Sequence, residues 1–129
     1  MNIYQKLSEL RKEVGTLEKG SANPFFKSRY VSIDDLLDAL QTPAEKLGLL
    51  ILQPCEDGEV ITEIINIEKP DEYVKSTLRL PDIADPQKMG SAITYYRRYT
   101  LLSLLALRTE DDDGNTASKS IEDVSQYLT

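Results

Sequence analysis

Two adjacent arginines, Arg97 and Arg98, lie among tyrosines in the segment "GSAITYYRRYTLLSLLAL" at residues 90–107. Guanidinium groups bind phosphate oxygens through paired hydrogen bonds, and an aromatic ring such as that of Tyr99 can support a base by stacking. The aliphatic residues that follow predict a packed helix, which would hold these charges in fixed positions. The alternative interpretation is that one arginine pairs with a carboxylate across a subunit interface.

A second group of cations beside an aromatic residue lies in "NPFFKSRYVS" at residues 23–32 and consists of Lys27, Arg29 and Tyr30. Because Asn-Pro disfavours a helix, this segment is expected to be a loop or an extended chain. This segment can bind phosphate, or it can be an ordinary exposed loop whose charges are solvated. Phe25 and Phe26 are predicted to fill the core rather than to stack on a ligand.

A third pair of cations lies in "EYVKSTLRL" at residues 72–80, which is a predicted strand. Side chains alternate between the two faces of a strand, so the apolar set faces the core and the other set faces outward. The outward set is Tyr73, Lys75, Thr77 and Arg79. This face is predicted to be basic and rich in hydroxyls, and either an anionic ligand or solvent can cover it.

The residue inventory narrows the possible chemistry. The sequence has no histidine and one cysteine, Cys55, which excludes the usual zinc sites and histidine-based catalytic triads. The run Glu110–Asp113 offers oxygen ligands of the kind that magnesium prefers, but its spacing is not that of an EF-hand. Adjacent carboxylates in a loop are commonly just solvated. We therefore predict no metal site and no cofactor.

Charge is distributed unevenly along the chain. The net charge is −7, and residues 1–24, 25–108 and 109–129 carry +1, −3 and −5. A protein coated in nucleic acid is disfavoured, but a local basic groove is not. The lone cysteine, the lack of a charged-then-apolar leader and the shortness of the longest apolar run lead us to expect a cytoplasmic protein without a membrane anchor.

Apolar periodicity predicts two helices in the N-terminal part of the chain. Apolar residues recur at steps of three and four over residues 2–18, which is typical of an amphipathic helix. Ser32, with Asp35 three residues later, approximates a capping box for a second helix, and Gly48 is its expected end. Pro43 predicts that this second helix bends or restarts.

Three strands and a long helix are expected to follow. The predicted strands are 49–54, 59–68 and 72–80, and the turn "EKPD" joins the last two as a hairpin. A helix from Pro86 to about Leu107 is long enough to cross a small sheet. The predicted fold class is therefore α+β, with strand and helix order β-β-β-α. A long helix crosses a three-stranded antiparallel sheet, with flanking N-terminal helices.

Three segments occur in a fixed order: "NPFFKSRYVSIDDLLDAL" at 23–40, "GSAITYYRRYTLLSLLAL" at 90–107 and "EDDDGNTA" at 110–117. Together they resemble the ERF family, the phage "essential recombination function" proteins that anneal single-stranded DNA. The resemblance covers about residues 20–117, which it implies to be the single-strand annealing core. Residues 1–19, as an N-terminal helix, and residues 118–129, as a tail, carry little of it.

The resemblance implies a β-β-β-α annealing core that pairs complementary strands without ATP in phage recombination and DNA repair. It implies a homo-oligomer, as a ring or helical filament, that holds single-stranded DNA by its backbone and is not an enzyme. Groove positions of the family carry over to Lys27, Arg29, Tyr30, Arg97, Arg98 and Tyr99. Many relatives continue with a linker and an acidic tail that engages the host single-strand binding protein, whereas this sequence departs from that pattern by ending soon after the core.

Two other functions are open to these residues. A metal-dependent phosphoryl enzyme would use Glu110–Asp113, and removal of divalent ions would then abolish DNA turnover. A purely structural oligomerisation domain would form oligomers without binding DNA, and it would have no evident use for Arg97 and Arg98.

Overall fold

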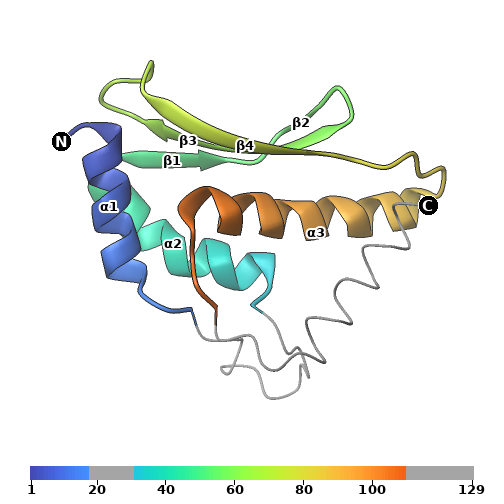
Figure 1. The fold of residues 1–129 in the computed structure, drawn as a ribbon, viewed down its shortest axis with the longest axis horizontal. Helices are drawn as coiled ribbons and strands as arrows, with labels where there is room; N and C mark the ends of the chain where they lie inside the picture. The colour runs from blue at the N-terminus through green and yellow to red at the C-terminus, as the bar shows by residue number, and fades with distance from the viewer. Residues whose placement is uncertain (18–30, 110–129) are drawn as a thin grey trace.

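The computed structural model of the protein describes residues 1–17 and 31–109. Figure 1 shows a sheet as one layer and helices α2 and α3 beneath it, while α1 stands at one end of the sheet. The described elements follow the order α1, α2, β1 to β4 and α3. The predicted α+β class, with a long C-terminal helix packed on an antiparallel sheet, is confirmed.

Helix α2 spans Ile33–Leu47 and begins where the sequence predicts. Ser32 Oγ accepts a hydrogen bond from the Asp35 N–H at 3.1 Å, and the Asp35 carboxylate accepts one from the Ser32 N–H at 3.2 Å. The helix continues through Pro43 as a single element instead of restarting, and it ends at Gly48 in the left-handed conformation. The local signals at both ends therefore determine its bounds.

Helix α1 spans Ile3–Val14 and is shorter than the predicted range 2–18. Gly15 ends it with φ 63° and ψ −144°, a conformation that residues with a Cβ atom rarely adopt. Leu10 on this helix is fully buried and belongs to the main core, so α1 packs on the rest of the domain.

The sheet has four strands rather than three. They are β1 (Leu49–Leu52), β2 (Cys55–Glu56), β3 (Glu59–Asn66) and β4 (Tyr73–Arg79). Strand β3 is central, because β4 pairs along one of its edges and β1 and β2 pair in succession along the other. The predicted strand 49–54 breaks at Gln53 and Pro54, since proline has no N–H for the ladder. The predicted β3–β4 hairpin is confirmed.

Helix α3 spans Pro86–Leu105 and packs on the inner face of β3, where burial alternates along the strand. Ile64 of β3 and Leu101 of α3 are both fully buried in one core cluster. Thr62 and Thr100 join the two elements through a hydrogen bond of 2.6 Å between their hydroxyls. The core thus combines apolar packing with one buried polar contact that fixes how α3 lies on the sheet.

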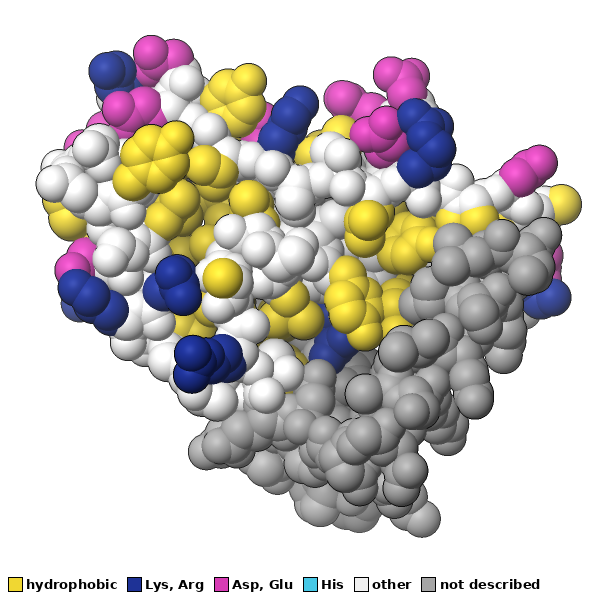
Figure 2. All heavy atoms as spheres, in the orientation of Figure 1, with side chains coloured by type: hydrophobic (Ala, Val, Ile, Leu, Met, Phe, Trp, Pro, Cys, Tyr) yellow, Lys and Arg dark blue, Asp and Glu magenta, His cyan; other side chains and the backbone are white. Residues whose placement is uncertain are grey.

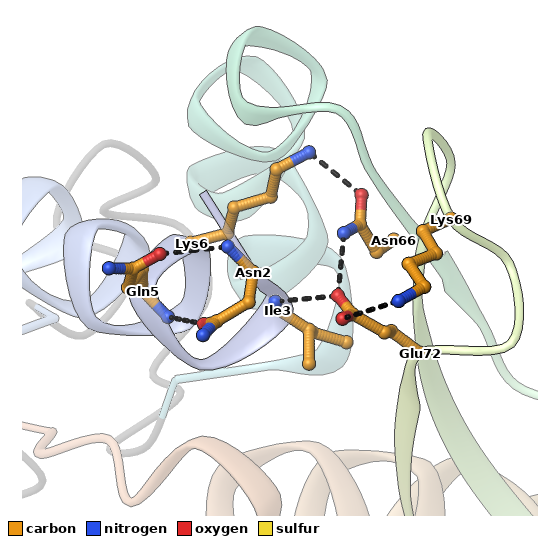
Figure 3. Close-up of polar contacts among 7 residues, drawn as sticks. All are labelled: Asn2, Ile3, Gln5, Lys6, Asn66, Lys69 and Glu72. Carbon is orange, nitrogen blue, oxygen red and sulfur yellow. Dashed lines mark hydrogen bonds and ion pairs between the residues drawn. The ribbon is translucent and has the colours of Figure 1, made fainter.

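A buried lysine ties α1 to the sheet (Figure 3). Lys6 is 3% exposed, and its Nζ donates to Asn66 Oδ1 at 2.8 Å and lies 3.4 Å from Glu68 Oε1. Asn66 Nδ2 donates to Glu72 Oε1 at 3.0 Å, and the same oxygen accepts the Ile3 N–H at 3.0 Å. These bonds connect the first turn of α1 to the end of β3 and to the turn that leads into β4.

This network makes stability depend on pH through Glu72. The hydrogen bond from Asn66 lowers the pKa of Glu72 below its ordinary value of 4.5, and the Ile3 N–H and Lys69 act in the same direction. Because the pKa is lower in the folded state, the carboxylate stabilises the fold above the unfolded-state value, and this contribution is lost as pH falls through the folded-state value. Glu72→Gln should therefore lower the free energy of unfolding near neutral pH.

The difference between Glu72→Gln and wild type should shrink in urea denaturation at about pH 3, where the carboxyl is increasingly protonated. A difference of the same size at about pH 3 and about pH 7 would contradict this role.

Candidate nucleic-acid interface

The predicted contact residues do not gather on one described surface. Lys27, Arg29 and Tyr30 lie outside the described residues, so their role stays a prediction. Ser76 Oγ donates to the Thr100 carbonyl of α3 at 2.6 Å, which shows that this side of β4 faces the helix. The alternate residues Lys75 and Arg79 therefore project from the outer face of the sheet, while the predicted residues of α3 lie on the other side.

Arg97 is held by a glutamine at the break between β1 and β2. Its Nε donates to Gln53 Oε1 at 3.0 Å, and Gln53 Nε2 donates to the Arg97 carbonyl and to Thr62 Oγ1, each at 2.9 Å. Within the described part of the chain, no carboxylate forms an ion pair with Arg97. A neutral amide thus orients the guanidinium, and no described carboxylate neutralises its positive charge.

Arg98 occupies a different environment from the one that the sequence predicts. The predicted contact with DNA requires an accessible side chain, but Arg98 is only 5% exposed. Its Nε donates to the carbonyl of Val31, just before α2, and its guanidinium carbon lies 5.2 Å from the centre of the Tyr99 ring. This position suits an anchor between α3 and the start of α2, and it gives no support to the prediction that Arg98 contacts DNA.

Three tyrosines of α3 divide between surface and core. Tyr95 and Tyr99 are half-buried, their ring centres are 4.7 Å apart and their hydroxyls are 3.1 Å apart. Tyr96 is 6% exposed and lies in the core, and burial raises its pKa. Tyr99 is about 200° around the helix from Arg97, so the two side chains leave different sides of α3.

The cations of β4 differ in how their charges are balanced. Arg79 Nη2 lies 2.8 Å from Glu59 Oε1 on the neighbouring strand, and Arg79 Nη1 donates to the Asp57 carbonyl at 3.4 Å. Lys75 is exposed and stands opposite Glu63 in the strand register, but the described contacts include no ion pair for it. Lys75 is therefore the more available of the two cations for an anion.

Helix α3 is basic in an acidic protein. It contains Lys88, Arg97 and Arg98 and no acidic residue, although the whole chain has a net charge of −7. Exposed polar or small residues cover its N-terminal half: Gln87, Gly90, Ser91 and Thr94. Gln53 is not among the predicted contact residues, because its one signal in the sequence is that a polar residue stands between an apolar strand and Pro54.

A family model described as the ERF superfamily matches residues 3–126. The chain belongs to the ERF superfamily. Membership of the ERF superfamily implies a role in phage recombination through annealing of single-stranded DNA, and the annealing proteins of this family are non-catalytic. Neither the curated proteins nor the solved structures provide a match to this chain.

Two other expectations concern metals and membranes. Within residues 1–17 and 31–109, no group of three or more cysteine or acidic side chains is placed to hold a metal ion. The acidic run Glu110–Asp113 lies outside these residues. No helix in the described part of this ERF protein has the length and apolar character needed to cross a membrane.

The two arginines should differ in their effect on stability. Arg98→Ala should lower the free energy of unfolding by about 1–3 kcal/mol, because it leaves the buried Val31 carbonyl without this donor. Arg97→Ala should cost less than about 1 kcal/mol, because it removes one half-exposed hydrogen bond. Urea denaturation of both variants measures the difference, and equal losses would refute the assignment of Arg98 as the anchor.

Proposed function

We propose that this ERF protein binds single-stranded DNA through its phosphate backbone and anneals complementary strands as a homo-oligomer, without ATP and without making or breaking covalent bonds. The observation that carries the proposal is that α3 bears two cations outside the core, Lys88 and Arg97, and no carboxylate, in a chain of net charge −7. Backbone contacts neutralise phosphates without reading sequence, which leaves base edges free to pair with a second strand.

Arg97 is the proposed phosphate contact on α3. Its Nε is occupied by Gln53, and no described carboxylate neutralises it, so its terminal nitrogens can serve a phosphate. The hydroxyls of Ser91 and Thr94 precede it on the exposed part of the helix and can donate further hydrogen bonds to phosphate oxygens.

Other contacts in the proposal come from the remaining predicted residues. The rings of Tyr95 and Tyr99 lie next to each other at a tilt of 36°, are partly exposed and can support a base. Lys75 adds a cation on the outer face of the sheet. The roles of Lys27, Arg29 and Tyr30 rest on the family resemblance alone.

An apolar row on the outer face of the sheet supports assembly. Leu50 lies opposite Ile65, which lies opposite Tyr73, so the three side chains cross three strands in one line. Leu50 and Tyr73 are 43% and 49% exposed in the single chain. Burial of this row against another copy fits a ring or filament. A host single-strand binding protein remains a proposed further partner, and the host cytoplasm is the proposed location.

Removal of the Arg97 charge tests the DNA contact. Arg97→Ala should weaken binding of an oligo-dT strand by at least about tenfold, since a charge-assisted hydrogen bond contributes about 1.5–3 kcal/mol and about 1.4 kcal/mol is a tenfold change. The slope of log affinity against log salt should become shallower by about 0.7 for each phosphate that the protein no longer neutralises. Fluorescence polarisation across a salt series measures both quantities.

Lys46→Ala is the matched control, because it removes one positive charge from an exposed side chain that pairs with Glu13. An Arg97→Ala variant with the affinity and slope of this control would overturn the assignment of Arg97. Annealing of complementary oligonucleotides should also proceed in the presence of a chelator. Dependence on divalent ions together with DNA cleavage would instead favour the phosphoryl enzyme.

Gly90 offers a second test. A Cβ atom at this position would meet no heavy atom within 4 Å, so packing inside the chain does not require a glycine there. Gly90→Ala should therefore stabilise the isolated chain by up to about 1 kcal/mol through helix propensity. If a phosphate or another subunit approaches the backbone here, the same variant should weaken DNA binding or assembly. Unchanged binding and assembly would show that Gly90 serves neither contact.

A further inference from the structure

An open hollow of about 370 Å³ lies where the end of α1 meets the segment that follows α3. Its charged and hydroxyl-bearing lining residues are Ser8, Arg11, Lys12, Thr16 and Arg108, and none of the described residues that line it is acidic. Figure 2 shows Lys and Arg side chains grouped at the lower left, the part of this face where α1 and the end of α3 lie side by side in Figure 1. The hollow therefore concentrates positive charge.

The cations of this hollow are poorly neutralised by the described residues. Neither Arg11 nor Arg108 forms an ion pair with any side chain in residues 1–17 and 31–109. Lys12 Nζ lies 3.4 Å from Glu9 Oε1, but both side chains are exposed, and such surface pairs contribute little. Three cations thus border one hollow, and the described residues supply a single weak counter-charge.

The backbone holds the two walls of the hollow together. The Leu17 N–H donates to the Arg108 carbonyl at 3.0 Å, and Leu17 forms a parallel bridge with Thr109. Leu17 is 6% exposed and packs in the core, so core packing holds this backbone contact in place. Cations from distant parts of the sequence are brought together before any ligand arrives, which lowers the entropy cost of binding.

Stabilisation of helix ends does not explain the whole arrangement. Arg11 and Lys12 lie in the last turn of α1, where cations interact favourably with the terminal carbonyls. The last turn of α3, in contrast, contains no basic residue, and Arg108 lies beyond its cap at Ala106. The hydroxyls of Ser8 and Thr16 in the same hollow have no part in such stabilisation.

We infer that this hollow is a binding site for a phosphate group, supplied either by the backbone of a polynucleotide or by free phosphate. Arginine and lysine with neighbouring hydroxyls are the donors that a phosphate accepts. Arg97 lies about 12 Å along α3 from the end of that helix at Leu105, and the hollow lies beyond this end, so it is a second site. The polynucleotide source rests on the proposed function, whereas the site for a phosphate group does not.

The test uses the full chain labelled with ¹⁵N. Inorganic phosphate and an oligo-dT strand without terminal phosphates are titrated separately, and the Nε–H resonances of Arg11 and Arg108 are followed. A shift with inorganic phosphate alone supports the site with free phosphate as its source, and a shift with oligo-dT supports the polynucleotide. If neither probe shifts these resonances, the inference is overturned.

Variants distinguish binding at this hollow from an effect of net charge and from binding at Arg97. The double variant R11A/R108A should bind the probe that shifts the arginine resonances at least about threefold more weakly than wild type. If that probe is oligo-dT, the slope of log affinity against log salt should also be shallower by about 0.7–1.4. R11K/R108K should restore most of the affinity. The control K46A/K69A removes the same charge from exposed lysines outside the hollow.

An equal loss of affinity in this control would overturn the inference, because net charge alone would then explain the binding. A loss of stability in R11A/R108A with unchanged binding would also overturn it and leave the helix-end role. If R11A/R108A binds oligo-dT normally while Arg97→Ala does not, the polynucleotide source fails and the proposed function stands.

Discussion

The contact between α3 and the inner face of β3 positions the proposed site. Its polar centre is the hydrogen bond between the Thr62 and Thr100 hydroxyls, and the Thr100 hydroxyl also bonds to the Tyr96 carbonyl at 2.8 Å. Both threonines are fully buried, so a shift of α3 along the sheet would break the hydrogen bond between them, which contributes about 0.5–1.5 kcal/mol. Apolar packing alone would tolerate more sliding than this contact allows.

The same contact between α3 and β3 places Arg97 beside the break between β1 and β2. Gln53 bonds to Thr62 on one side and to Arg97 on the other, so the arginine is fixed relative to the core through one amide. A neutral acceptor orients a guanidinium without cancelling its charge. Arg79 shows the opposite arrangement, since Glu59 both orients it and neutralises it. Among the described residues, then, cations of the same type serve different purposes according to their acceptors.

The sequence predicts well those elements whose ends are determined by residues close to them in the chain. Helix α2 begins at the Ser32 capping box and ends at Gly48, and the turn after β3 produces the expected hairpin. The break at Gln53 was missed, because a two-residue interruption leaves no periodic signal and gains its meaning from Arg97, far along the chain. The burial of Lys6 was missed as well, since lysine between apolar positions is typical of a solvated helix face.

The sequence supplies the residue types of the candidate site but not the surfaces on which they lie. The basic character of α3 and its aromatic neighbours are properties of the sequence by itself, as are the family motifs that indicate annealing. Only the tertiary structure decided that Arg98 is buried against Val31, that Lys75 lies across the sheet from Arg97, and that Arg11 and Arg108 share a hollow. The physical reason is that local interactions determine which element forms, whereas long-range packing determines which side chains are removed from water.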